Sequence, residues 1–151
     1  LPKGLVGNLA EVSRNGGSLE DYVRQRGLSD HFIFLGYVAR PEEVIHGCDA
    51  LISVARRVGP WGRSVIEAMA LGRPIISTGP YKGFVTHERT GIVHSEFKPD
   101  QLAREILELA KNEGKYDKMA RAAQMHIHQL CSQSERAAEL LTGWKMLVSS
   151  E

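Results

Sequence analysis

The sequence predicts an α/β fold, in which a Rossmann-like parallel sheet is covered by helices on both faces and is followed by a helical C-terminus. Short apolar runs alternate with helical segments through the middle of the chain, which is the pattern of βαβ units. After residue 99 the pattern is helical only. Because 151 residues suffice for one hydrophobic core but not for two large ones, we expect a single domain over residues 1–151.

The N-terminal part of the chain predicts two strands and one helix. Leu5–Gly7 is a short apolar stretch of strand type, and Leu19–Arg26 is helical with Gly27 marking its end. Polar residues 8–18 between them predict a loop. Phe32–Gly36 is a continuous apolar run, which is typical of a strand buried on both faces.

The remaining elements follow in alternation. Pro41 opens a short helix, since proline suits the first helical turn. Ala50–Val54 predicts a second buried strand. The later elements are a helix at Arg63–Leu71, a strand at Pro74–Thr78, a short strand at Ile92–Val93, and helices at Pro99–Lys111, Lys115–Leu130 and Ser134–Val148.

Composition excludes several classes of function. The net charge is +1, so no strong field draws the chain to nucleic acid or to a membrane surface. Nothing within these 151 residues resembles a secretory signal or a transmembrane span. Cys48 and Cys131 are far apart and are interpreted as free buried thiols, and the six histidines have no metal-binding spacing. A reducing, cytoplasmic setting is therefore expected.

The loop from Gly59 to Ser64 predicts an anion site. It follows a strand of the parallel sheet and leads into a helix, so it lies at the sheet edge where ligands bind. The first N–H groups of a helix have no internal acceptor and hold anions well. Arg63 adds a positive charge, and Glu67 lies about one turn further along. This combination suits a nucleotide, with its phosphates on the N–H groups and its ribose hydroxyls on the carboxylate.

Two local alternatives stay open at these positions. Ser64-x-x-Glu67 matches a capping box, in which Glu67 would bond to the backbone of Ser64. Arg63 would then be a solvated side chain at an ordinary helix N-terminus. The sequence pattern by itself does not separate these roles from nucleotide binding.

The same segment resembles a family motif. Trp61-Gly62, Glu67-Ala68-Met69-Ala70, Gly72 and Pro74-Ile75-Ile76 resemble the donor-binding motif of the retaining nucleotide-sugar glycosyltransferases of the GT-B fold, known as glycosyl transferase group 1 or family four. Six weaker stretches match that family in the same order: Val6-Gly7, Gly27–Asp30, Phe34–Val38, Cys48–Leu51, Thr90–Val93 and Asp100–Leu107. The resemblance covers most of the chain and corresponds to the C-terminal half of the GT-B fold.

The resemblance implies a set of donor-binding residues. Glu67 would bind the ribose, and Gly62, Arg63 and Ser64 would hold the diphosphate. The loop with Val38 and Arg40 would lie against the base, unless it is a simple connection. Gly79 and Lys82 would touch phosphate or sugar through N–H groups or the amine, unless they form an ordinary surface turn. Trp61 completes the set as the aromatic residue of the motif.

Gly59 departs from the family pattern, because the family has a glutamate there that holds sugar hydroxyls. Glycine accepts no side-chain hydrogen bond, so we assign no catalytic residue. Three explanations stay open: a different sugar, compensation by a neighbouring side chain, or a loss of activity.

The resemblance also implies partners for the chain. Its family function is retaining transfer of a sugar from a nucleotide diphosphate to an acceptor hydroxyl, without a metal or another cofactor. The alternative is a non-catalytic sugar-nucleotide-binding or scaffold domain. The acceptor domain and the first strand and helix of the donor domain are missing before Leu1, so we expect a fragment that works with its own N-terminal domain. The full enzyme could also contact a membrane peripherally.

Overall fold

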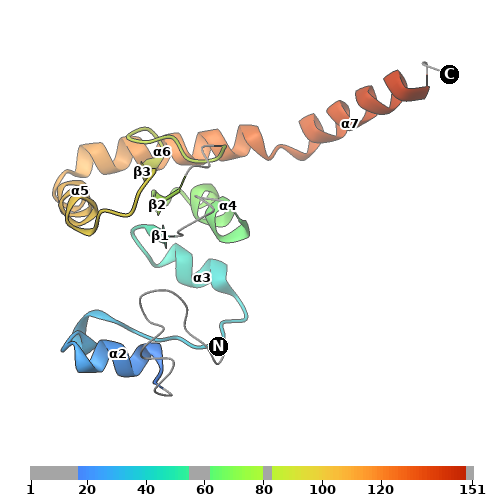
Figure 1. Ribbon diagram of the computed structural model, residues 1–151. Coiled ribbons are helices and arrows are strands. Elements are labelled where there is room, and N and C mark those ends of the chain that lie inside the picture. The colour runs from blue at the N-terminus through green and yellow to red at the C-terminus, as the bar shows by residue number, and fades with distance from the viewer. Residues whose placement is uncertain (1–16, 55–61, 80–82, 149–151) are drawn as a thin grey trace. The chain divides into compact units, whose positions relative to one another are not determined.

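The computed structural model describes residues 17–54, 62–79 and 83–148 (Figure 1). The chain divides into two compact units, residues 1–39 and residues 40–151. The strand expected at Leu5–Gly7 lies outside the described residues.

The first unit contains helix α2, Leu19–Gln25, as the sequence predicts. A capping box fixes its start: the Ser18 hydroxyl accepts the Asp21 N–H at 3.1 Å, and the Asp21 carboxylate accepts the Ser18 N–H at 3.0 Å. Gly27 follows the helix with a φ of +66°, a conformation that glycine adopts without steric cost. The predicted helix is therefore confirmed, together with its glycine end.

The prediction of a buried strand at Phe32–Gly36 is wrong, because the structure describes this segment and assigns it no strand. After the short 3₁₀ turn η2, Ser29–His31, the backbone is extended at Phe32 but belongs to no strand. A strand exists through hydrogen bonds to a neighbouring strand, and the described sheet contains no ladder to this segment. Its side chains are accordingly exposed, Ile33 to 87%.

The second unit contains a parallel sheet in the order β1-β2-β3, formed by Leu51–Val54, Ile75–Thr78 and Gly91–His94. Leu51 pairs with Ile75, and Ile75 pairs with Gly91. The strands predicted at Ala50–Val54, Pro74–Thr78 and Ile92–Val93 are thus confirmed to within one or two residues. Their carboxyl ends share one edge of the sheet.

Burial differs between the strands. All residues of β2 are buried, whereas β1 alternates between half-buried and exposed positions, and Ile52 and Val54 are 58% and 44% exposed. The expectation that β1 is buried is therefore wrong for one of its faces. Side chains alternate along a strand, so Leu51 packs against the core while no described element covers Ile52.

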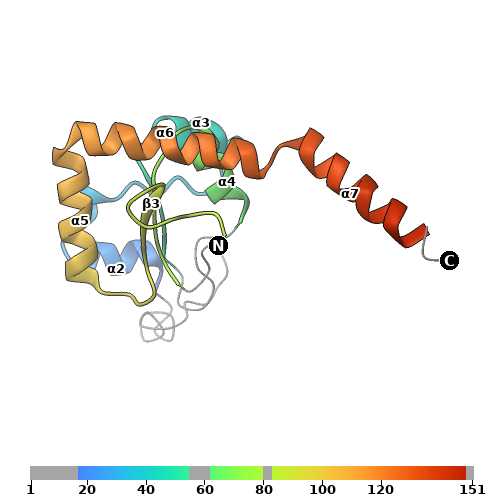
Figure 2. The ribbon, with the colours of Figure 1, turned by 90° about the horizontal axis from the view of Figure 1, so that it is seen from above.

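Helices cover both faces of the sheet. The described helices of this unit are α3 Pro41–His46, α4 Arg63–Ala70, α5 Pro99–Lys111, α6 Glu113–Leu130 and α7 Gln133–Val148, close to the predicted bounds. Ile75 packs with α4 and the C-terminal half of α6, whereas Ile76 packs with α5 and Met119 of α6. Figures 1 and 2 show α6 running from the end of α5 past α4, so this helix contributes to both clusters.

The last helix differs from the others, because α7 has no buried residue. Within the described residues, no helix combines the length and apolarity needed to cross a bilayer. Cys48 and Cys131 are free, as expected, but both are exposed, so their interpretation as buried thiols is wrong. Cys48 follows the last turn of α3, where its thiol donates to the Val44 carbonyl at 3.1 Å.

Candidate functional site

The first turn of α4 lies at the carboxyl edge of the sheet. Gly62 caps this helix with a φ of +127°, which is outside the range that side-chain-bearing residues favour. Its carbonyl accepts the N–H groups of Val65 and Ile66 at 3.1 and 3.3 Å, so the helix begins at Arg63. The N–H groups of Arg63 and Ser64 are in the first turn, where the helix itself offers no acceptor. They are therefore available to an anion at the positive end of the helix dipole.

The capping box at Ser64-x-x-Glu67 is not formed. A capping residue lies outside the helix with extended backbone, whereas Ser64 is already the second helical residue. Glu67 instead accepts a hydrogen bond from Nε of Arg63 at 2.5 Å, one turn away on the same face. The hydrogen bond and the charge of Glu67 raise the pKa of the Arg63 guanidinium above its usual value. The structure thus joins two of the predicted site residues in an ion pair.

Glu42 of α3 lies within electrostatic range of this pair. The pKa of Glu42 is lowered by its own backbone N–H, then by Arg40, and also by the charge of Arg63. Arg40 precedes α3 and pairs with Glu43 at 2.8 Å and with Glu42 at 3.4 Å. Arg40 therefore has two carboxylate partners. Val38 belongs to the first unit, where it is half-buried.

Gly79 directly follows β2 and is buried. Its N–H donates to the carbonyl of His94 at 2.8 Å, and its φ is +124°. This N–H is consequently not available to phosphate, and a contact from Gly79 would be made by its Cα or carbonyl. Gly59, Trp61 and Lys82 lie outside the described residues, so their predicted roles stay predictions.

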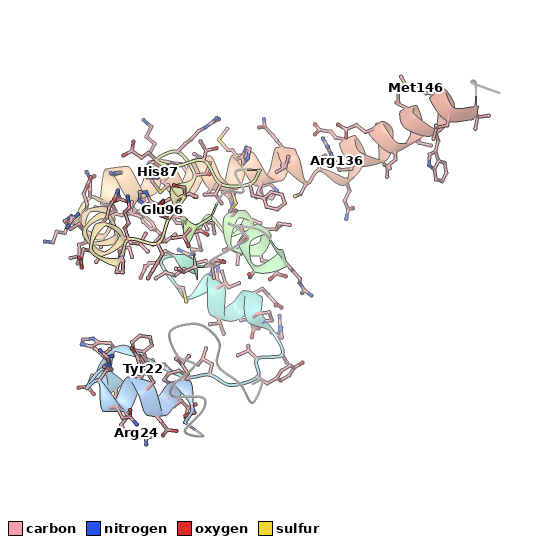
Figure 3. The ribbon with its side chains drawn as sticks, in the orientation of Figure 1. Tyr22, Arg24, His87, Glu96, Arg136 and Met146 are labelled. Atoms are coloured by element: carbon pink, nitrogen blue, oxygen red, sulfur yellow. The ribbon has the colours of Figure 1, made fainter. Side chains whose placement is uncertain are left out.

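A histidine cluster that the sequence interpretation missed lies beside the ends of β2 and β3. It borders a hollow of about 450 Å³ lined by Gly79, Val85, Thr86, His87, Val93, His94 and Ser95. The His94 and His87 rings are 4.9 Å apart, and His94 Nε2 is 2.7 Å from Oε2 of Glu105 on α5. His87, labelled in Figure 3, accepts the Val93 N–H at Nδ1. No sequence spacing signals this cluster, since helix packing brings Glu105 to the strand end.

The carboxyl group of Glu105 makes the stability of the chain pH-dependent. Burial raises its pKa, but hydrogen bonds from His94 and Gln101 outweigh burial, so its pKa is lowered from 4.5. A lowered folded-state pKa adds stability above the ordinary value and loses it as the pH falls through the folded value. Between about pH 6 and pH 3, the free energy of unfolding of the unaltered chain should fall by on the order of 1 kcal/mol more than that of Glu105→Gln. Urea unfolding across this range measures the difference, and parallel curves would contradict it.

A polar network at the opposite end of α4 fixes the neighbouring elements. Arg73, in the turn after α4, donates to the His46 carbonyl at 2.7 Å and contacts the Tyr116 hydroxyl at 3.4 Å. Tyr116 on α6 in turn donates to the Asp49 carbonyl at 2.9 Å. These bonds tie the end of α3 to the α4–β2 turn and to α6. They therefore hold the helix that carries Glu67.

In the described part of the chain, the His, Cys, Asp and Glu side chains form no group of three that could hold a metal ion. The polar groups at the first turn of α4 are suited to an organic anion. A carboxylate, a guanidinium and helix N–H groups therefore lie together at one sheet edge of an α/β domain, an arrangement that is chemically suited to an anion.

Comparison with known proteins identifies the family. The family model of "Glycosyl transferases group 1" matches residues 10–126, and the chain belongs to this family. Mannosylfructose-phosphate synthase of Agrobacterium fabrum is 27% identical over 127 residues, which are 82% of this chain and 28% of that protein. A putative glycosyltransferase of Bacillus subtilis, YtcC, is 27% identical over 80% of this chain and 31% of its own length. The chain thus spans about three-tenths of the curated relatives it matches.

Solved structures give the same fold. HepE of Anabaena in complex with UDP superimposes with a TM-score of 0.73 at 22% identity, over 91% of this chain and 38% of HepE. Sucrose-phosphate synthase of Thermosynechococcus elongatus gives 0.71 at 21% identity, over 94% of this chain and 36% of that enzyme. The fold is that of the C-terminal half of a GT-B glycosyltransferase, as the sequence predicts.

Proposed function

We propose that this chain is the donor-binding domain of a retaining glycosyltransferase and that it holds a nucleotide-diphosphate sugar at the first turn of α4. The observation that carries the proposal is the grouping of unlike polar groups there. Arg63 and Ser64 offer helix N–H groups at the carboxyl edge of a parallel sheet, and the Glu67 carboxylate lies one turn further along. A nucleoside diphosphate needs both, because its phosphates are anionic and its ribose hydroxyls donate hydrogen bonds.

The same groups would assist the transfer reaction. When the glycosidic bond to the diphosphate breaks, negative charge develops on the departing phosphate oxygen. Helix N–H groups fixed at that position would stabilise this charge without reorganising, which is commonly the largest electrostatic contribution to catalysis, and the Arg63 guanidinium would add its positive charge. Support for the donor class comes from HepE of Anabaena, whose structures were solved with UDP and with UDP-glucose.

The proposal extends to the protein as a whole. The acceptor would bind to an N-terminal domain of the same protein, since the relatives are about three times as long as the matched region. Trp61, Lys82 and Arg40 would complete the donor site. The enzyme would be cytoplasmic, with peripheral membrane contact where its acceptor requires it, and the transfer would use no metal.

Nucleotide titration tests this function. We expect UDP, GDP or ADP to bind the isotope-labelled chain weakly and to shift the amide resonances of Gly62, Arg63, Ser64 and Glu67 in NMR spectra. The binding should be weak because a donor in this family lies between two domains. In a transfer assay with the matching nucleotide sugar, the chain by itself should form no product. Resonance shifts confined to other elements, or turnover by the chain itself, would contradict the proposal.

A second candidate is a non-catalytic sugar-nucleotide-binding or scaffold domain. Gly59 favours it, because a glycine replaces the residue that holds the sugar hydroxyls in the family motif. The two candidates share nucleotide binding and differ in turnover. A transfer assay on the intact gene product separates them, since only the first predicts product formation.

A further inference from the structure

We propose that Arg63 is a positioning residue that pairs with Glu67 and leaves it for an incoming diphosphate. Ribose binding would thereby be coupled to phosphate binding. This inference rests on the proposed donor site and adds to it an exchange of partners within the site. The exchange would favour complete nucleotides over nucleosides, which lack the phosphates that draw Arg63 away.

The ion pair has one fixed and one movable member. Nε of Arg63 lies 2.5 Å from Oε1 of Glu67, and both side chains project from α4 one turn apart. The Glu67 side chain is only 23% exposed, whereas the Arg63 side chain is 82% exposed. Glu67 is thus held in place by its surroundings, while the guanidinium is free to rotate into solvent. An exchange of partners would therefore move Arg63 and leave Glu67 where it is.

While the pair is formed, it weakens Glu67 as a hydrogen-bond acceptor for ribose. Arg63 uses one carboxylate oxygen of Glu67 and neutralises its charge, so a ribose hydroxyl meets a weaker acceptor. An exposed pair of this spacing is weak, however, and a stronger partner can break it. A diphosphate carries more charge than a carboxylate and binds at the positive end of the helix dipole, where Arg63 begins the helix. Arg63 should therefore prefer the diphosphate.

Glu42 places a further carboxylate within electrostatic range of the same guanidinium. The charge of Arg63 contributes to the lowered pKa of Glu42, so the first turns of α3 and α4 share this electrostatic field. Arg40 already pairs with Glu42 and with Glu43. Among the described residues, removal of Arg63 therefore leaves Glu67 as the carboxylate of this group without a paired cation, so that its charge is available to a ligand.

The exchange predicts opposite effects of one substitution on two ligands. Arg63→Ala should weaken binding of a nucleoside diphosphate about tenfold, because a charge-assisted contact is lost. The same change should strengthen binding of the matching nucleoside about twofold, the factor expected when an exposed pair one turn apart is removed. A residue that only assists phosphate binding would not improve the nucleoside.

The experiment uses NMR titration of the chain with uridine, guanosine and adenosine and with their diphosphates. Arg121→Ala is the matched control, because Arg121 pairs with Asp117 one turn away on α6 at 3.6 Å, outside the site. It should leave both affinities unchanged. As a second measurement, inorganic pyrophosphate should raise the nucleoside affinity of the unaltered chain by drawing Arg63 from Glu67. This enhancement should disappear in Arg63→Ala.

The outcomes distinguish the exchange from the site itself. If no nucleotide shifts the resonances of α4, the donor site is wrong and the exchange falls with it. If diphosphates bind at α4 but Arg63→Ala weakens both ligands, or leaves the nucleoside unchanged, the exchange is wrong while the donor site stands. Opposite changes for the two ligands, with pyrophosphate enhancement only in the unaltered chain, support the exchange.

Discussion

Gly91→Ala is expected to destabilise the chain by about 3 kcal/mol, because no space exists for a side chain at this position. A methyl group on Gly91 would lie 2.7 Å from Cγ1 of Val85 and closer still to the carbonyl oxygen of Ile75. The neighbour that is too close is backbone of β2, which pairs with Gly91 in the sheet. The clash can therefore be removed only if β2 and β3 move apart, because repacking of side chains does not displace a backbone carbonyl.

Gly143→Ala is the matched control for this prediction. A methyl group on Gly143 of α7 meets no other atom within 4 Å, so only helix propensity changes. We expect a neutral or slightly favourable effect, up to about 1 kcal/mol. Urea unfolding followed by circular dichroism measures both variants. Equal midpoints for the two variants would show that the approach of β2 to β3 is looser than described.

The second large effect is expected at Glu67. Glu67→Gln should weaken nucleoside diphosphate binding by about tenfold to a hundredfold, because a charged acceptor for the ribose hydroxyls contributes roughly 1.5–3 kcal/mol. Thermal stability should change little, since the ion pair with Arg63 is largely exposed on the arginine side. The paired measurements are the dissociation constant from NMR titration and the melting temperature.

Glu108→Gln provides the control for the Glu67 variant. Glu108 pairs with Lys115 at 2.7 Å between α5 and the start of α6, and this pair is not part of the proposed site. Its substitution should leave nucleotide affinity unchanged. A melting temperature that falls for Glu67→Gln while its affinity for nucleotide stays constant would assign Glu67 a structural role and contradict the ribose interpretation.

Packing in the folded sheet explains why residue 91 is a glycine. The sequence pattern alone gave no reason for this. Thr90-Gly91-Ile92-Val93 resembles a family strand, but the resemblance does not say why glycine is needed. The φ of Gly91 is not in the left-handed region, so its backbone conformation is open to other residues. The requirement comes from the close approach of the Ile75 carbonyl, which exists only once β2 and β3 pair.

The sequence by itself determined the elements whose signals are local. Helices α2 to α6 begin at a capping residue, a proline or a glycine, and β2, which opens with two isoleucines, is fully buried. The motif from Trp61 to Ile76 also identified the family, because it constrains a loop, a helix and a strand in one stretch. Local hydrogen bonding and short-range sterics decide such features, and adjacent residues carry this information.

Only the tertiary structure decided the features that depend on distant neighbours. Apolarity suits Phe32–Gly36 to a strand, but a strand also needs a partner for its hydrogen bonds, and exposure of Ile52 depends on what covers that face. The start of α4 at Arg63, set by the φ of Gly62, replaced a capping box with the Arg63–Glu67 pair. Helix packing brought Glu105 to His94. In each case the deciding contact joins groups that come together only when the backbone folds. A short stretch of sequence therefore does not reveal it.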